Sequence, residues 1–158
     1  MKNSISLSIG KDNSLVDISL NGEHQYITFE MLKQIWSDVS CVTVEDIEYI
    51  HTEVSGNYVI CCAYVAQGQG GIVFIWDTDT KKIVHYSDGK FALTAAINDN
   101  KVYVLRDVHY WGVTSHLELD YCDFGTMSEN NEVTKVFIDD STLIGNSDTI
   151  RSEEHTSE

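Results

Sequence analysis

The feature that most constrains the fold of this chain is a unit of four short strand-like segments that occurs twice. Turns rich in Gly, Asn, Asp and Ser separate the segments, and the chain contains no proline. Ser55 in a turn of the first unit corresponds to Asn98 in the second, and Asp77 corresponds to Asp120, in each case 43 residues later. The candidate strands are 47–53, 58–66, 72–77 and 82–87, followed by 91–97, 101–108, 116–122 and 133–138.

A four-stranded unit that repeats about every 40 to 45 residues is typical of a β-propeller blade. One twisted sheet cannot bury both of its faces alone, so such units stack face to face. The runs 58–65 and 72–76 are apolar at nearly every position, as in strands that are covered on both faces. We therefore predict a mainly β domain in which residues 47–90 and 91–140 form two antiparallel four-stranded meanders, arranged as propeller-type blades.

Two blades do not close a ring, because propellers contain about four to eight. The sequence therefore favours a truncated propeller, and the alternative is that the two meanders form a smaller sandwich or barrel. In either case residues 1–150 are expected to be one β-rich domain or propeller fragment.

Residues 1–46 are expected to contain a hairpin and one short helix. Segments 4–9 and 15–20 alternate apolar and polar residues around a turn at 10–13, which predicts two paired strands. Apolar residues then recur at helical spacing, so we predict one amphipathic helix near residues 29–38, capped by Thr28. Its apolar stripe, which includes Trp36, is interpreted as core.

Residues 73–84, Val-Phe-Ile-Trp-Asp-Thr-Asp-Thr-Lys-Lys-Ile-Val, resemble the third strand, turn and fourth strand of a WD-repeat blade. The Trp76-Asp77 pair stands where that family has its Trp-Asp. The resemblance covers one blade, since the second unit has Asp120-Tyr121 in the corresponding place, and the family's Gly-His pair is missing. Gln69-Gly70-Gly71 replaces the family's Asp in the turn before the third strand. The resemblance implies a propeller scaffold without the side-chain hydrogen-bond network of the family.

The charge balance excludes several classes of partner. The chain has 25 Asp and Glu against 10 Lys and Arg, a formal net charge of −15. Such a surplus repels phosphate backbones and anionic membranes, so we expect neither nucleic acid nor a membrane as a direct partner. There is no apolar run of the roughly 18 residues that a membrane helix needs, and no secretory signal is recognisable. We therefore expect a cytoplasmic protein whose four cysteines (Cys41, Cys61, Cys62 and Cys122) are reduced and mostly buried.

The last eight residues, 151–158, resemble the in-frame translation of a short-read sequencing adapter. We interpret them as a non-native tail, and the alternative is an ordinary polar terminus. Without this segment the remaining residues carry a formal charge of −13, because it contributes one Arg and three Glu. The acidic character therefore does not depend on the tail.

Chemical motifs are few. Gly68–Gly71 lies between two predicted strands and is interpreted as a hairpin loop, not as a phosphate-binding loop. One cluster could supply a zinc ligand set or a general base, although the same residue types are common on an exposed strand face. We expect no catalytic residue, no cofactor and no metal. The cluster consists of Asp107, His109, His116, Asp120, Cys122 and Asp123.

A Tyr-Trp pair in a loop between strands is typical of a binding hot spot, with the alternative that Trp111 folds back over the blade edge. The predicted partner-binding residues are His109, Tyr110, Trp111 and His116. The leading functional hypothesis is a non-enzymatic protein-interaction or scaffold module with a protein partner, for which the negative charge favours a basic protein. The alternatives are a small acidic inhibitor or immunity-type protein that binds a basic partner, and a fragment of a ligand-binding or enzymatic propeller.

Overall fold

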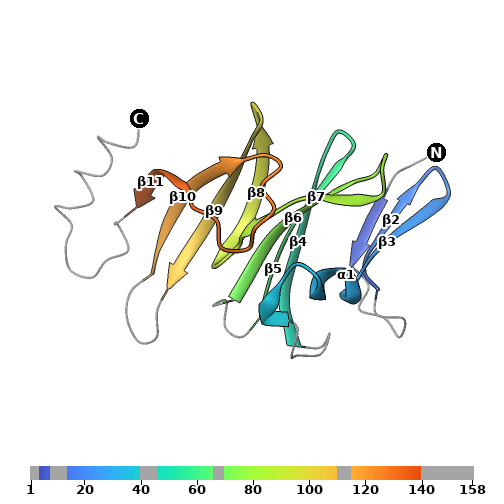
Figure 1. Cartoon of the computed structure of the whole chain (residues 1–158), viewed down its shortest axis with the longest axis horizontal. Coiled ribbons are helices and arrows are strands. Elements are labelled where there is room, and N and C mark those ends of the chain that lie inside the picture. The colour runs from blue at the N-terminus through green and yellow to red at the C-terminus, as the bar shows by residue number, and fades with distance from the viewer. Residues whose placement is uncertain (1–3, 8–13, 40–45, 66–69, 110–114, 140–158) are drawn as a thin grey trace.

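The computed structural model describes residues 4–7, 14–39, 46–65, 70–109 and 115–139, which form three antiparallel sheets (Figure 1). The predicted mainly β fold is confirmed. Each sheet follows the order of the chain, so each is a simple meander. The first sheet contains β1 (Ser4–Leu7), β2 (Ser14–Leu20) and β3 (Glu23–Thr28). The second contains β4 (Ile47–Ser55), β5 (Tyr58–Val65), β6 (Gly70–Asp77) and β7 (Lys82–Asp88). The third contains β8 (Ala92–Asn98), β9 (Lys101–His109), β10 (Ser115–Asp123) and β11 (Thr134–Asp139).

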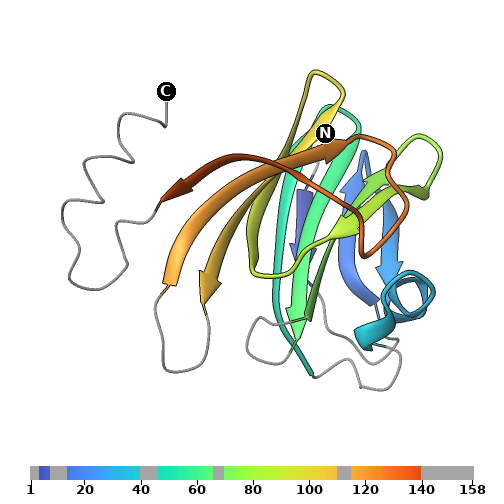
Figure 2. The same ribbon diagram turned by 60° about the vertical axis from the view of Figure 1, so that its left-hand side comes forward.

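The β4–β7 sheet lies between the other two and is buried on both faces (Figures 1 and 2). Successive side chains of a strand point to opposite faces, which divides its apolar residues between two clusters. In β5, Cys61 and Ala63 belong to the cluster shared with the first sheet, whereas Ile60 and Cys62 belong to the cluster shared with β8–β11. The nearly continuous apolar runs of β5 and β6 are explained by this double coverage.

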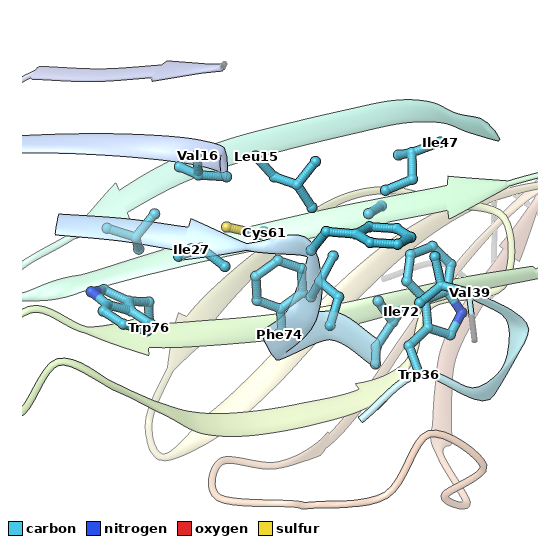
Figure 3. Close-up of a cluster of buried hydrophobic side chains, with 14 of the residues drawn as sticks. Leu15, Val16, Ile27, Trp36, Val39, Ile47, Cys61, Ile72, Phe74 and Trp76 are labelled. Carbon is cyan, nitrogen blue, oxygen red and sulfur yellow. The ribbon is translucent and has the colours of Figure 1, made fainter. Parts of the chain in front are cut away.

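The first cluster joins β2, β3 and the helical segment to the β4–β7 sheet (Figure 3). Leu15 and Ile27 come from the first sheet, and Phe74 and Trp76 face them from β6. Trp36 is 1% exposed, so its predicted place in the core is confirmed.

The helical segment is shorter than predicted. Instead of one helix over 29–38, the chain forms α1 (Phe29–Lys33) and a separate 3-10 turn, η1 (Ser37–Val39). The predicted cap is confirmed, because the Thr28 side chain accepts a hydrogen bond from the Met31 amide at 3.3 Å. The break allows Trp36 and Val39, three residues apart, to enter the same cluster as the helix.

The third strand of the first sheet, β3, is absent from the predicted elements. Asn21 and Gly22, interpreted as the end of the hairpin, instead form the turn between β2 and β3. Their φ angles of 53° and 87° are left-handed, as the tight turn of a hairpin requires.

The eight strands predicted between residues 47 and 138 are all present, with ends displaced by at most two residues. Differences of two residues occur at the end of β4 and at the start of β6, which begins at Gly70 and so takes two residues from the predicted glycine loop. A Cβ atom on Gly71 would collide with the backbone oxygen of Gly89, at the β7–β8 junction. Glycine therefore permits this close approach of two backbones.

The described residues do not form a closed ring of sheets, so the blade arrangement is not established by the fold alone. Within this part of the chain no helix is long and apolar enough to cross a membrane. The segment 151–158, interpreted as a non-native tail, lies outside the described residues.

Candidate functional site

The predicted partner-binding residues lie in the connection between β9 and β10 or directly beside it. Tyr110 and Trp111 lie outside the described residues. His109 ends β9 and pairs with Ser115, while His116 pairs with Val108. Directly paired residues of neighbouring strands share a face, so the register places His109 and His116 on opposite faces of the sheet.

His109 lies at the edge of the face that points away from the β4–β7 sheet. Its ring centroid is 4.8 Å from that of Phe91, and its Nδ1 atom is 2.9 Å from the Asp107 carbonyl oxygen. The side chain is exposed, and these contacts fix its orientation. His109 is therefore the more exposed of the two described residues of the predicted set.

His116 belongs to a row of polar side chains along β10 that points toward the β4–β7 sheet. His116, Glu118, Asp120 and Cys122 alternate along β10, and the pairing register places them on one face. His116 Nε2 lies 2.7 Å from Glu118 Oε2, and Lys135 Nζ lies 2.6 Å from Glu118 Oε1. Burial raises the pKa of Glu118, but the hydrogen bonds from Lys135 and His116 outweigh it, so the net pKa is below its usual value.

Asp120 forms a buried ion pair with Arg106, which was not among the predicted site residues. Arg106 Nε donates to Asp120 Oδ2 at 2.7 Å and Nη2 donates to Oδ1 at 3.0 Å, a bidentate geometry. Two further donations reach the backbone oxygens of Lys90 and Asp88, at 2.9 and 3.0 Å. Burial alone lowers the pKa of Arg106, but the hydrogen bonds to Asp120 and the charge of Asp120 raise it by more. The net pKa is above its usual value, so the guanidinium stays charged.

This network ties β9 and β10 to the connection between β7 and β8. Arg106 is 5% exposed and Asp120 is fully buried, so their hydrogen bonds within the protein take the place of the hydrogen bonds to water that both groups lose on folding. A cavity of about 200 Å³ lies beside the pair and is lined also by Glu118 and Lys135. The charges are already matched to one another, which identifies the network as a structural link between the sheets.

His85 on β7 is a second buried polar group between the same two sheets. Its Nδ1 accepts a hydrogen bond from the Gly125 amide at 3.0 Å, so the proton of the neutral ring is on Nε2 and is donated to Ser87 Oγ at 2.9 Å. Burial lowers the pKa of His85 from 6.5 to about 4. The Cys122 sulfur lies 4.0 Å from Nε2.

The possible metal or general-base cluster is not assembled. Asp123 faces away from the row on β10 and lies 3.3 Å from Lys101 Nζ, while Asp120 is held by Arg106. Among the described residues, no three His, Cys, Asp or Glu side chains are grouped so that they could hold a metal ion. Of the four cysteines, the three that the structure describes (Cys61, Cys62 and Cys122) are buried free thiols. Burial raises the pKa of Cys62 to about 12.

The face of β8–β11 that points away from the β4–β7 sheet carries large apolar side chains, and we call it the outer face. Pairing places Tyr103 opposite Tyr121 and Leu105 opposite Leu119, and the two tyrosine rings lie 5.2 Å apart. These side chains are half-buried and belong to neither of the two core clusters. The apolar members of the outer face are Tyr103, Leu105, Leu117, Leu119, Tyr121 and Phe137.

The sequence already contained a signal for the outer face. Leu117, Leu119 and Tyr121 alternate with His116, Glu118 and Asp120, so β10 has one apolar and one polar face. The unusual feature is that the polar row points into the protein, where Arg106 and Lys135 neutralise it. The apolar row consequently points outward.

Comparisons of the chain with protein-family models, with curated proteins and with solved structures each found no match.

Proposed function

We propose that the chain is a non-enzymatic protein-interaction module of the β-propeller type, in which β4–β7 and β8–β11 are successive blades. The observation that carries this proposal is the β4–β7 sheet, which other sheets of the same chain cover on both faces. Each blade of a propeller is covered in this way by its neighbours. The first strand of the third sheet, β8, contacts β4, β5 and β6, which brings the first strands of both units close together. A common axis along that edge is consistent with such contacts.

The partner is expected to bind at the connection between β9 and β10, through His109, Tyr110, Trp111 and His116. The pairing of His109 with Ser115 holds the two ends of this connection together, and the ring of Phe91 supports His109. The Arg106–Asp120 pair stiffens the same two strands below it. A rigid scaffold that presents aromatic loop residues is a common form of binding site.

The charge of the chain indicates a basic partner. A net charge of −15 attracts positively charged surfaces over several ångströms and accelerates association, and salt screens this attraction. The proposed interaction should therefore weaken as ionic strength rises, mainly through a slower association rate.

Affinity capture from native cells, quantified by mass spectrometry, tests the proposal when the full chain is compared with a Tyr110→Ala, Trp111→Ala variant. We expect at least one basic protein to be retained by the full chain, and roughly tenfold or more weakly by the variant. Tyr26→Ala is the matched control, because Tyr26 is an aromatic residue, 44% exposed, on the first sheet. Equal retention by the full chain and the loop variant would show that this connection is not the binding site.

A further inference from the structure

We propose that the outer face of β8–β11 is a self-association surface that packs against the same face of a second copy of the chain. This inference concerns a different surface from the β9–β10 connection, and so it goes beyond the proposed function. It starts from the six outer-face side chains, which are large and apolar but contact neither core cluster. Contiguous apolar surface of this kind is uncommon on a monomer and usually marks an interface.

The opposite face of the same sheet shows how this chain covers such a surface. There Val102, Val104 and Cys122 pack against Ile60 and Val73 of the neighbouring sheet. Sheet-on-sheet contact is therefore already used on one side of β8–β11, and the outer face has the same strands and the same alternation. A second antiparallel sheet is the matching occupant.

The size of the outer face is sufficient for a dimer. The four strands contain six to nine residues each, and ~3.3 Å per residue with ~4.8 Å between strands gives a flat area of roughly 490 Å². Side chains that protrude from the sheet increase the accessible area toward the ~800 Å² per partner of a standard interface. Two identical faces can meet about a two-fold axis, which is the commonest symmetry of homo-oligomers.

The charges on the outer face suit such an axis. Lys101 lies at one end of β9 on this face, and Asp107 lies at the other end on the same face. A two-fold axis in the interface, at right angles to β9, brings Lys101 of each copy opposite Asp107 of the other. Each dimer then gains two opposite-charge contacts at the edge of its apolar centre, which offset part of the repulsion between two acidic chains.

Sedimentation equilibrium of the full chain across the micromolar range tests this proposal. We expect a monomer–dimer equilibrium that Leu119→Glu weakens by at least ~100-fold, because the new charge occurs twice in the centre of the interface. Val54→Glu should leave the dimer intact, because Val54 is 63% exposed and lies on β4. Circular dichroism and the urea midpoint establish that each variant is folded.

Charge reversal tests the orientation of the two copies. Lys101→Glu should weaken the dimer roughly tenfold, and the double variant Lys101→Glu, Asp107→Lys should restore it, which loss of the local Lys101–Asp123 contact alone would not allow. A chain that remains monomeric at all concentrations, or a folded Leu119→Glu variant that still dimerises, would overturn the proposal. Because Leu119→Glu leaves the β9–β10 connection unchanged, its capture of a basic partner reports on the proposed function separately.

Discussion

Acidification from pH ~6.5 to pH ~4 should destabilise the protein through His85, because this buried histidine stays neutral in the folded state. The ring is fully buried. Its Nδ1 accepts a hydrogen bond from the Gly125 amide, and its Nε2 donates a hydrogen bond to Ser87 Oγ. Both ring nitrogens are occupied by partners that suit the neutral form, because an amide N–H cannot accept a second proton from the ring. The native state therefore resists protonation, as its pKa of about 4 indicates.

The sign and size of the effect follow from the two pKa values. Above pH ~6.5 His85 is neutral in both the folded and the unfolded chain, so it contributes no pH dependence. Between ~6.5 and ~4 only the unfolded chain takes up the proton, and the free energy of unfolding falls by about 1.4 kcal/mol per pH unit. The full loss from this one group is about 3 kcal/mol, a large share of the stability of a small domain.

Urea denaturation between pH 7.5 and 4 measures this loss, with His85→Gln as the comparison. Glutamine retains a hydrogen-bonding side chain near Ser87 but does not titrate. Carboxylates contribute equally to both proteins, so the difference between their pH slopes isolates His85. We expect wild type to lose about 3 kcal/mol more than the variant over this range. Equal slopes for the two proteins would refute the assignment of a neutral buried histidine.

Three further perturbations have definite expected outcomes. Asp120→Asn should cost about 3–5 kcal/mol in urea denaturation, because it removes the negative charge that pairs most closely with the buried Arg106 guanidinium. Arg106→Met combined with Asp120→Leu should cost clearly less than the single change, and equal costs would argue against a charge-paired network. Gly71→Ala should cost about 1–3 kcal/mol because its Cβ meets the Gly89 backbone, and an unchanged urea midpoint would contradict this. The three buried cysteines should remain unlabelled by a thiol reagent in the native protein and react after denaturation, as peptide mass mapping can establish.

The strand pattern was predictable because hydrophobic alternation and turn residues are local signals. The runs in β5 and β6 indicated strands covered on both faces, and the two core clusters confirm that interpretation. β3 was missed although Asn21-Gly22 is a strong hairpin signal, because the residues after it are mostly polar and half of them are exposed. The helix was overextended because the same three- and four-residue spacing fits both one long helix and two shorter turns.

The polar site was less predictable because its partners are distant in sequence. Arg106 on β9 pairs with Asp120 on β10, and His85 on β7 contacts Gly125 in the connection between β10 and β11, so no local spacing indicates either contact. The relative faces of His109 and His116 depend on the pairing register, and a shift of one residue would place both on the same face. Sequence alternation alone gave the row on β10 but not the direction in which it points.

The central structural claim is that β4–β7 is covered on both faces and is the middle layer of the stack. Residue-resolved native-state hydrogen exchange tests this most directly, because amides that open only on global unfolding exchange slowest. We expect the slowest amides to be those of β5 and β6, with exchange free energies equal to the global free energy of unfolding. Exchange from β5 and β6 as fast as from the edge strand β1 would contradict it.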